Sequence, residues 1–146
     1  MVDIYVETCR DDIELPAYAR NGDAGMDIRA AMDITIEPGD TVVIPTGLKM
    51  AIPDGYEIQV RPRSGISAKT SLRVANSPGT IDSGYRDEIG IIMWNSSTDD
   101  SYEIKKGDRI AQIVLNEVPK INFIPTDNVK LIGEDRGGGF GSTGKE

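Results

Sequence analysis

The sequence predicts an all-β fold, either a sandwich, a barrel or a jelly roll, with at most one short helix. Two observations support this prediction. Short segments rich in β-branched residues alternate apolar and polar side chains, as strands do when one face is buried. Clusters of Pro, Gly and Asp separate these segments, and many short strands between such turns are typical of all-β architectures.

The predicted strands follow one another along the chain up to residue 118. The longest, 109–118, carries apolar residues on both faces, so we expect it to lie centrally and to be covered on both sides. One window, 64–70, contains Ala and Lys residues that favour a turn or two of helix, although it is too short to be stable alone. The other predicted strands are 2–7, 26–30, 34–36, 41–44, 48–52, 56–60, 89–94 and 102–104.

Length and composition indicate one domain. The chain has 146 residues, of which 38% are hydrophobic and 27% charged, as in ordinary soluble globular proteins. No apolar run reaches the roughly 18 residues needed to span a bilayer. The start of the chain has no signal-peptide layout, so we expect a cytoplasmic protein with no membrane partner. We expect a β domain over 1–132 and a flexible, Gly-rich tail over 133–146, which orders only on a ligand or neighbour.

Charge and residue types narrow the chemistry. The net charge is −8 and there is no Lys/Arg run, so we expect no nucleic-acid partner. Histidine is absent, so a general base must be Asp, Glu, Lys or Tyr. A metal must then be held by oxygen ligands, which Mg²⁺, Mn²⁺ and Ca²⁺ prefer. The single cysteine, Cys9, can form no intramolecular disulfide, and we expect it to be a buried or half-buried small side chain.

Four short segments carry candidate site residues, and each has a plain structural alternative. Segment 61–65 places two arginines and a serine beside a glycine, which suits phosphate oxygens or a solvated turn. Asp82, in a predicted hairpin over 76–86, either activates water or caps its own turn. Asp27 lies in a short apolar strand, where a carboxylate needs a cation unless the edge is exposed. Segment 107–112 predicts a hairpin turn with a surface ion pair.

The Gly-rich tail contains two further patterns. Residues 139–145 match both G-x-G-x-x-G and G-x-x-x-x-G-K. Both patterns require a strand before them and a helix after them, and the Ser or Thr that follows the P-loop lysine is missing. Neither nucleotide-binding fold is therefore expected, although glycine-rich backbone can still approach a phosphate closely.

Taken together and in order, five segments resemble the five motifs of the trimeric dUTPase (deoxyuridine 5′-triphosphate nucleotidohydrolase) family. They span almost the whole chain, and the third contains the core G-x-I-D-x-x-Y-R. The resemblance implies a distorted jelly-roll β-barrel, a homotrimer with shared active sites, and a tail that closes over a neighbouring active site. The five segments are 24–30, 61–65, 76–88, 107–112 and 136–144.

The resemblance also implies an activity, the Mg²⁺-assisted attack of water on the α-phosphate of dUTP. Its products are dUMP and pyrophosphate, so the reaction limits uracil in DNA and supplies dUMP for thymidylate synthesis. Asp82 would be the catalytic base, and Asp27 would anchor Mg²⁺ through water. Tyr85 would pack under the deoxyribose and exclude a 2′-hydroxyl, while Phe140 would stack on uracil. The other implied substrate-binding residues are Arg63, Ser64, Gly65, Asn76, Gly79, Thr80, Ile81, Gln112, Arg136, Gly141 and Ser142.

Three positions depart from the usual family pattern: Met26, Ser67 and Asp87. Asp87 adds a side chain and a negative charge where a glycine usually follows Tyr-Arg, but no proposed catalytic group is lost. Two alternatives stay open. One is a dCTP deaminase-like enzyme, which would need a glutamate base in a different local motif. The other is a regulatory binding protein built on the same fold.

Overall fold

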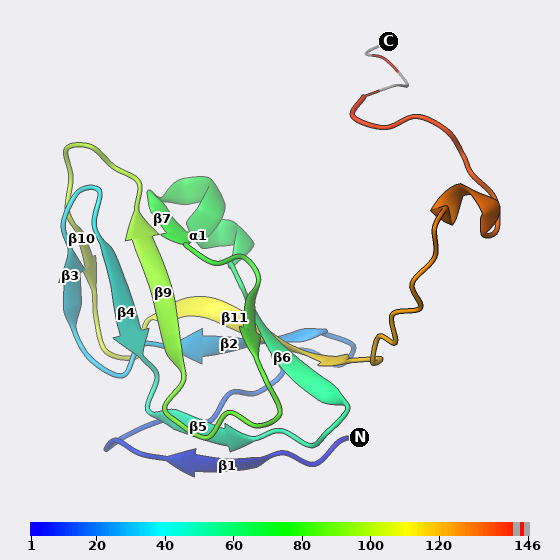
Figure 1. Ribbon diagram of the computed structural model, residues 1–146. Helices are drawn as coiled ribbons and strands as arrows, with labels where there is room; N and C mark the ends of the chain where they lie inside the picture. Colours follow the sequence, from blue (N-terminus) through cyan, green and yellow to red (C-terminus); the bar gives the residue numbers. More distant parts are fainter. Residues whose placement is uncertain (142–143, 145–146) are drawn as a thin grey trace.

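Strands predominate in the computed structural model, which describes residues 1–141 and 144, and the predicted all-β class is confirmed (Figure 1). The predicted helix is also present as α1, Ser64–Lys69, and a 3-10 turn, η1, spans Val129–Leu131. The strands are β1 Tyr5–Thr8, β2 Gly25–Arg29, β3 Ile34–Ile36, β4 Thr41–Pro45, β5 Leu48–Ala51, β6 Tyr56–Arg61, β7 Leu72–Val74, β8 Gly79–Ile81, β9 Gly90–Asn95, β10 Tyr102–Ile104 and β11 Arg109–Glu117.

The strands form four antiparallel sheets, ordered β2-β11-β6-β8, β4-β9-β7, β1-β5 and β10-β3. Among the described strands no sheet closes on itself, so the predicted barrel is an open and distorted one. One cluster of buried apolar side chains draws on both larger sheets and on the two strand pairs. Its fully buried members include Ile28, Ile36, Ile44, Leu48, Leu72, Ile91, Met93 and Ile104.

β11 lies between β2 and β6, in the middle of the largest sheet. Its residues Ile110, Ala111, Ile113 and Val114 are all buried, so both faces of the strand are covered. This confirms the central position that its apolar residues on both faces predict. Cys9 is half-buried, also as predicted.

One prediction of local structure is wrong: residues 76–86 do not form a two-stranded hairpin. β7 pairs with β9, whereas β8 pairs with β6 in the other large sheet. The chain crosses from one sheet to the other through residues 75–78, where the Ser77–Pro78 peptide bond is cis. The turn residues are visible in the sequence, but the choice of partner strand depends on long-range packing that a local pattern does not contain.

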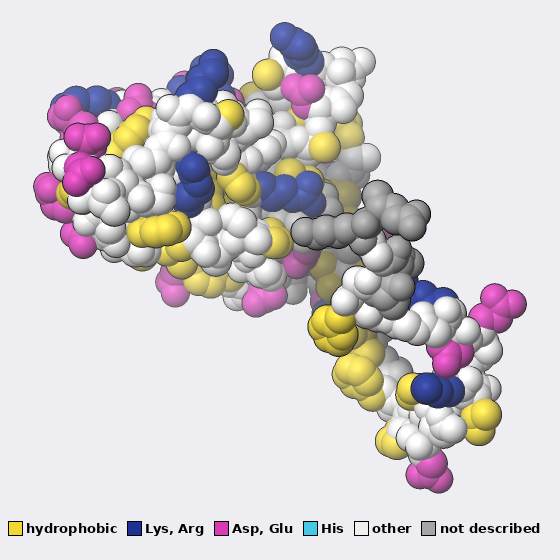
Figure 2. Space-filling model, turned by 90° about the horizontal axis from the view of Figure 1, so that it is seen from above, with side chains coloured by type: hydrophobic (Ala, Val, Ile, Leu, Met, Phe, Trp, Pro, Cys, Tyr) yellow, Lys and Arg dark blue, Asp and Glu magenta, His cyan; other side chains and the backbone are white. Residues whose placement is uncertain are grey.

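After β11 the chain leaves the body of the protein. Residues 119–141 are exposed throughout, and Figure 1 shows this segment running away from the sheets. Apolar side chains lie along it, visible as yellow groups on the extended arm in Figure 2. They are Ile121, Phe123, Ile124, Val129, Leu131 and Ile132, each at least 69% exposed. A row of apolar side chains of this kind is typical of a surface that a partner covers.

No helix within the described residues has the length and apolar character needed to cross a membrane.

Candidate active site

Three segments that are far apart in sequence meet at Asp27 on β2. The Arg63 Nε donates to Asp27 Oδ1 at 2.8 Å, and the Arg109 Nη1 donates to Asp27 Oδ2 at 3.3 Å. The Asp27 side chain is 33% exposed, so two guanidinium groups balance a partly buried carboxylate. This is the pairing that a carboxylate in an apolar strand requires. In the surface ion pair predicted for segment 107–112, the cation Arg109 therefore pairs with Asp27, on another strand.

Local backbone structure sets the position of each guanidinium. Arg63 is the N-cap residue of α1, with extended backbone at φ −88° and ψ 132°, so its side chain lies where the chain turns out of β6. Arg109 begins β11, next to a register shift against β2. Arg63 Nη1 also donates to the Arg109 carbonyl oxygen at 3.4 Å. The two cations therefore occupy one small region of a chain whose net charge is −8, which suits a polyphosphate.

Gln112 completes this group on the neighbouring strand. It lies opposite Asp27 in the β11–β2 pairing, and its Nε2 donates to the Pro62 carbonyl oxygen at 2.9 Å. Gly25 makes room for it, because a Cβ at this position would lie 2.5 Å from Gln112 Oε1. The amide is thus held between the Asp27 strand and segment 61–65, within reach of the same ligand as Arg63. Ser64 and Gly65, in the first turn of α1, are exposed beside it.

Asp82 and Tyr85 lie in a turn directly after β8. The Tyr85 N–H donates to the Asp82 carbonyl oxygen at 3.1 Å, which closes the turn. Both side chains are exposed, so the Asp82 carboxylate can meet a ligand or a second chain. The Tyr85 hydroxyl donates to the Glu88 carbonyl oxygen at 2.8 Å.

The loop before β8 brings Asn76 against Gly79. A Cβ on Gly79 would lie 3.0 Å from the Asn76 Nδ2 and 3.3 Å from the Val60 Cβ. A side chain at position 79 would therefore push the Asn76 amide away from the β8 backbone by a few tenths of an ångström. Gly79 and Ile81 are buried while Asn76 and Thr80 are exposed, and β8 is the edge strand of its sheet, with one side not paired to another strand of that sheet. Such an edge can pair with the polar edge of a base.

Within one chain, the Asp27 group and the Asp82 turn are far apart. Asp27, Gln112 and Arg61 lie opposite one another across β2, β11 and β6, and β8 pairs with the far side of β6 at Gly79. Neighbouring strands are about 4.8 Å apart, so β2 and β8 are separated by roughly 14 Å. Asp82 follows the far end of β8, which places it roughly 20 Å from Asp27 by the same spacings. A single chain therefore does not bring these predicted residues together.

The remaining predicted residues lie in the C-terminal segment. Arg136, Phe140 and Gly141 are exposed and lie apart from both groups. Phe140 adopts φ 47° and Gly141 φ 82°, a local turn that presents the aromatic ring to solvent. Ser142 lies outside the described residues.

Three residues that shape these groups, Gly25, Arg109 and Glu88, lie in segments that carry the family resemblance, but their contacts are not predicted by the sequence. The charge of Arg109 is visible beside a turn, but its partner Asp27 lies 82 positions away. Glu88 accepts hydrogen bonds from Arg10, 78 positions away, and from the Gly47 N–H. The described part of the chain contains no group of three or more carboxylate or cysteine side chains placed to hold a metal ion alone.

Comparisons with known proteins agree on one family. The dUTPase family model matches residues 11–144. The deoxyuridine 5′-triphosphate nucleotidohydrolase of Fusobacterium nucleatum is 45% identical over 99% of this chain and 100% of its own length. The enzyme of the same name from Desulfotalea psychrophila is 51% identical over 92% of this chain and 89% of its own.

Solved structures give the same result. A mutant dUTPase of Staphylococcus bacteriophage 80alpha, solved with dUpNHpp, matches with a TM-score of 0.89 and 29% identity, over 98% of this chain and 99% of that one. A mutant dUTPase from phage phi11 of S. aureus, described as coordinating a structural Mg(II) ion, matches with a TM-score of 0.81 and 25% identity, over 88% and 99% of the two chains. The predicted jelly-roll class is thereby confirmed. On the strength of sequence and structure alike, this chain belongs to the dUTPase family.

Proposed function

We propose that this protein hydrolyses dUTP to dUMP and pyrophosphate by attack of water on the α-phosphate. The observation that carries the proposal is the convergence of three family motifs on Asp27, where Arg63, Arg109 and Gln112 form a cationic, hydrogen-bonding group. In a cell, this reaction limits uracil in DNA and supplies dUMP for thymidylate synthesis. Cytoplasmic localisation stays a prediction from the sequence.

The Asp27 group is suited to a triphosphate. Arg63 presents a planar fork of donors, and the Ser64 hydroxyl and Gly65 N–H lie at the exposed first turn beside it. The Gln112 amide adds a neutral donor and acceptor that is already oriented by Pro62. Fixed donors of this kind stabilise charge that develops on phosphate oxygens without reorganising during the reaction.

Mg²⁺ fits this site as an ion held mainly by the substrate. The described residues offer one suitable carboxylate, Asp27, and Mg²⁺ commonly binds through one or two carboxylates, several waters and substrate phosphates. Asp27 would hold it through water while keeping its arginine partners. When bound, the ion would neutralise phosphate charge and favour the bent chain that in-line attack requires. Arg63 and Arg109, each bonded to one carboxylate oxygen, would keep the Asp27 carboxylate in place.

The Asp82 turn supplies the remaining roles. Asp82, exposed directly after β8, would accept a proton from the attacking water, since histidine is absent from the chain. Tyr85 would pack under the deoxyribose and leave no space for a 2′-hydroxyl. Asn76 and the backbone of Gly79–Ile81 would pair with the polar edge of uracil. A mismatched base would leave buried polar groups unpaired, which is strongly unfavourable.

A complete site then requires more than one copy of the chain, and we propose a homotrimer with shared active sites. The separation of the Asp27 group from the Asp82 turn supports this assembly. The exposed apolar side chains of residues 121–132 support it too, because they lack cover within the chain. We propose that the β domain extends to residue 132. The tail from 133 would close over a neighbour's site, where Phe140 would stack on uracil and Arg136, Gly141 and Ser142 would contact phosphates.

The decisive experiment is pyrophosphate release from dUTP by the wild-type protein and by Asp82→Asn. We expect the variant to lose about 10²- to 10⁴-fold in kcat while keeping its melting temperature, because Asp82 is exposed. Sedimentation of both proteins establishes that the assembly is unchanged. Full turnover by Asp82→Asn would remove Asp82 as the base, and absence of pyrophosphate with the wild-type protein would reject the proposed activity.

A further inference from the structure

Arg10 and Glu88 form the best-aligned ion pair outside the proposed active site. Arg10 Nε donates to Glu88 Oε1 at 2.6 Å, and Arg10 Nη2 donates to Glu88 Oε2 at 3.1 Å. The pairing is two-pronged, which fixes the carboxylate plane as well as its distance. The two residues are 78 positions apart, so the ion pair joins the N-terminal segment to the end of the Asp82 turn.

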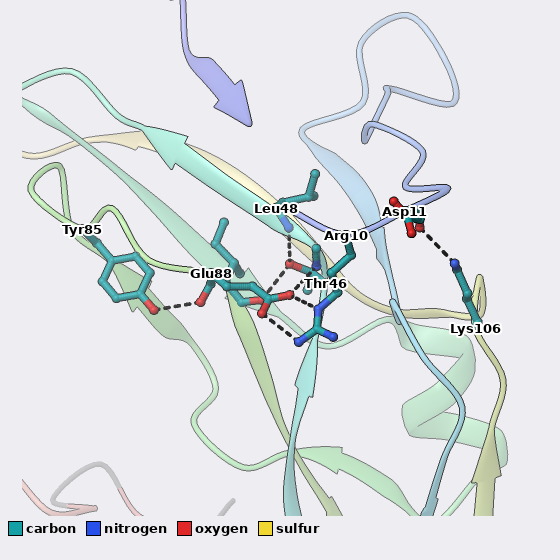
Figure 3. A network of polar contacts seen from close by, with 9 residues as sticks. Arg10, Asp11, Thr46, Leu48, Tyr85, Glu88 and Lys106 are labelled. Carbon is teal, nitrogen blue, oxygen red and sulfur yellow. Dashed lines mark hydrogen bonds and ion pairs between the residues drawn. The ribbon is translucent and has the colours of Figure 1, made fainter. Parts of the chain in front are cut away.

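Glu88 is held from a third side, as Figure 3 shows. The Gly47 N–H donates to Glu88 Oε1 at 2.9 Å, and the adjoining Thr46 hydroxyl donates to the Ile89 carbonyl oxygen at 2.7 Å. Gly47 has φ 72°, and a Cβ there would lie 2.6 Å from Ile13, so the loop can hold this shape only with glycine. The Glu88 carboxylate is therefore joined to Arg10 and to the β4–β5 loop, and the Ile89 backbone is joined to Thr46 and Leu48 of the same region.

Tyr85 depends on this fixed point. Its hydroxyl donates to the Glu88 carbonyl oxygen at 2.8 Å, and the residue is 41% exposed. A residue with so much exposure is not locked by packing into the core. Its position is set by the short turn that begins at Asp82 and by the hydrogen bond that ends at Glu88.

We propose that Arg10 and Glu88 are positioning residues that set how strictly the protein excludes a 2′-hydroxyl. The ion pair anchors the Glu88 side chain, and the Ile89 N–H, which donates to the Leu48 carbonyl oxygen at 2.8 Å, anchors the peptide whose carbonyl accepts the Tyr85 hydroxyl. With both anchors in place, the Tyr85 ring would be held rigidly under the sugar. This inference rests on the proposed function, in which Tyr85 contacts the deoxyribose.

The physical reason is that exclusion of a hydroxyl depends on small displacements. The 2′-hydroxyl of a ribose is excluded because the Tyr85 ring leaves no space for it. If the ring can move by a fraction of an ångström, the site accepts the ribose and still binds the deoxyribose. Loosening the Arg10–Glu88 ion pair should therefore improve ribonucleotide binding relative to deoxyribonucleotide binding. A merely structural ion pair would instead weaken both ligands equally, or lower stability alone.

The test is the ratio of dissociation constants for UpNHpp and dUpNHpp, which are not turned over, measured by calorimetry with Mg²⁺ present. We expect Glu88→Gln and Arg10→Gln to lower this ratio by about two- to tenfold, the effect of one weakened hydrogen-bonded contact. Arg10→Lys keeps the positive charge but loses the two-pronged hydrogen bonding of the guanidinium, so we expect it to lower the ratio by a smaller factor. Glu103→Gln is the matched control, because Glu103 pairs with Lys105 at an exposed place outside both site groups.

Tyr85 variants separate this inference from the proposed function. Tyr85→Ala should abolish most of the preference for dUpNHpp over UpNHpp. If this variant leaves the ratio unchanged, the sugar-contacting role of Tyr85 itself is rejected. Tyr85→Phe removes the hydrogen bond to Glu88, so adding Glu88→Gln to it should change the ratio no further. The positioning role is overturned if Tyr85→Ala lowers the ratio but Glu88→Gln does not. It is also overturned if the effects of Glu88→Gln and Tyr85→Phe are fully additive.

Discussion

The Asp27 group and the C-terminal segment contribute to the same proposed site in opposite ways. The Asp27 group is complete in one chain: a partly buried carboxylate, two guanidinium groups and an oriented amide, all attached to a four-stranded sheet. The segment 119–141 is exposed throughout and lies away from the sheets. The difference teaches that the Asp27 group is preorganised in one chain, whereas any cover that the C-terminal segment gives the proposed site would come from contacts that form on binding or assembly.

Removing the tail should separate these two contributions most clearly. A chain truncated after Ile132 should lose about 100-fold or more in kcat/KM for dUTP, because base stacking alone is worth about 1–3 kcal/mol. Its melting temperature should change by less than about 2 °C, since exposed residues contribute little to folding. Phe140→Ala is the narrower variant and should account for part of the loss. Undiminished kcat/KM in the truncated chain would show that the tail does not cover the site.

Asp27→Asn should instead disrupt the preorganised Asp27 group. The substitution leaves Arg63 and Arg109 without their carboxylate, and should weaken the apparent Mg²⁺ affinity about tenfold in titrations of dUTP turnover. Because the pair is partly exposed, the free energy of unfolding should fall by only about 1 kcal/mol. Asp33→Asn removes another carboxylate, paired at 4.0 Å with Lys105, and serves as the control. If turnover were unchanged in excess chelator, Mg²⁺ would have no place in the site.

Gly79→Ala should produce a smaller, local effect on base recognition. The new Cβ would lie 3.0 Å from the Asn76 Nδ2, so the amide must shift by a few tenths of an ångström. We expect KM for dUTP to rise about three- to tenfold, with kcat little changed. Gly84→Ala, in the turn that follows β8, meets no atom within 4 Å and should leave KM unaltered. Equal behaviour of the two variants would mean that Asn76 does not contact the base.

The smallest expected effect concerns the stability of the fold in acid. The hydrogen bond from Arg10, followed by that from the Gly47 N–H, outweighs desolvation and holds the pKa of Glu88 below its ordinary value near 4.5. The ionised carboxylate therefore contributes stability that is fully present above about pH 4.5 and is lost as pH falls through the lower pKa of the folded state. Melting curves of Glu88→Gln should converge with those of the wild type in that acid range and differ by at most about 2 °C at neutral pH.

How much of the site the sequence predicts depends on how local the relevant feature is. The strand periodicity, the helix at 64–69 and the central position of 109–117 follow from neighbouring residues, and the structure confirms them. The two-stranded hairpin at 76–86 is not confirmed, because strand pairing is settled by the core and not by the turn.

By itself, the sequence determined the all-β class and excluded histidine as a general base, while the residues that would contact a phosphate or a base stay a prediction from the family resemblance. Only the tertiary structure decided that Asp27 is paired with Arg63 and Arg109, that Gly25 makes room for Gln112, and that Arg10 pairs with Glu88. The physical reason is distance along the chain. Periodicity and turn propensity act over a few residues, whereas these contacts join positions that only the packing of a common core brings together.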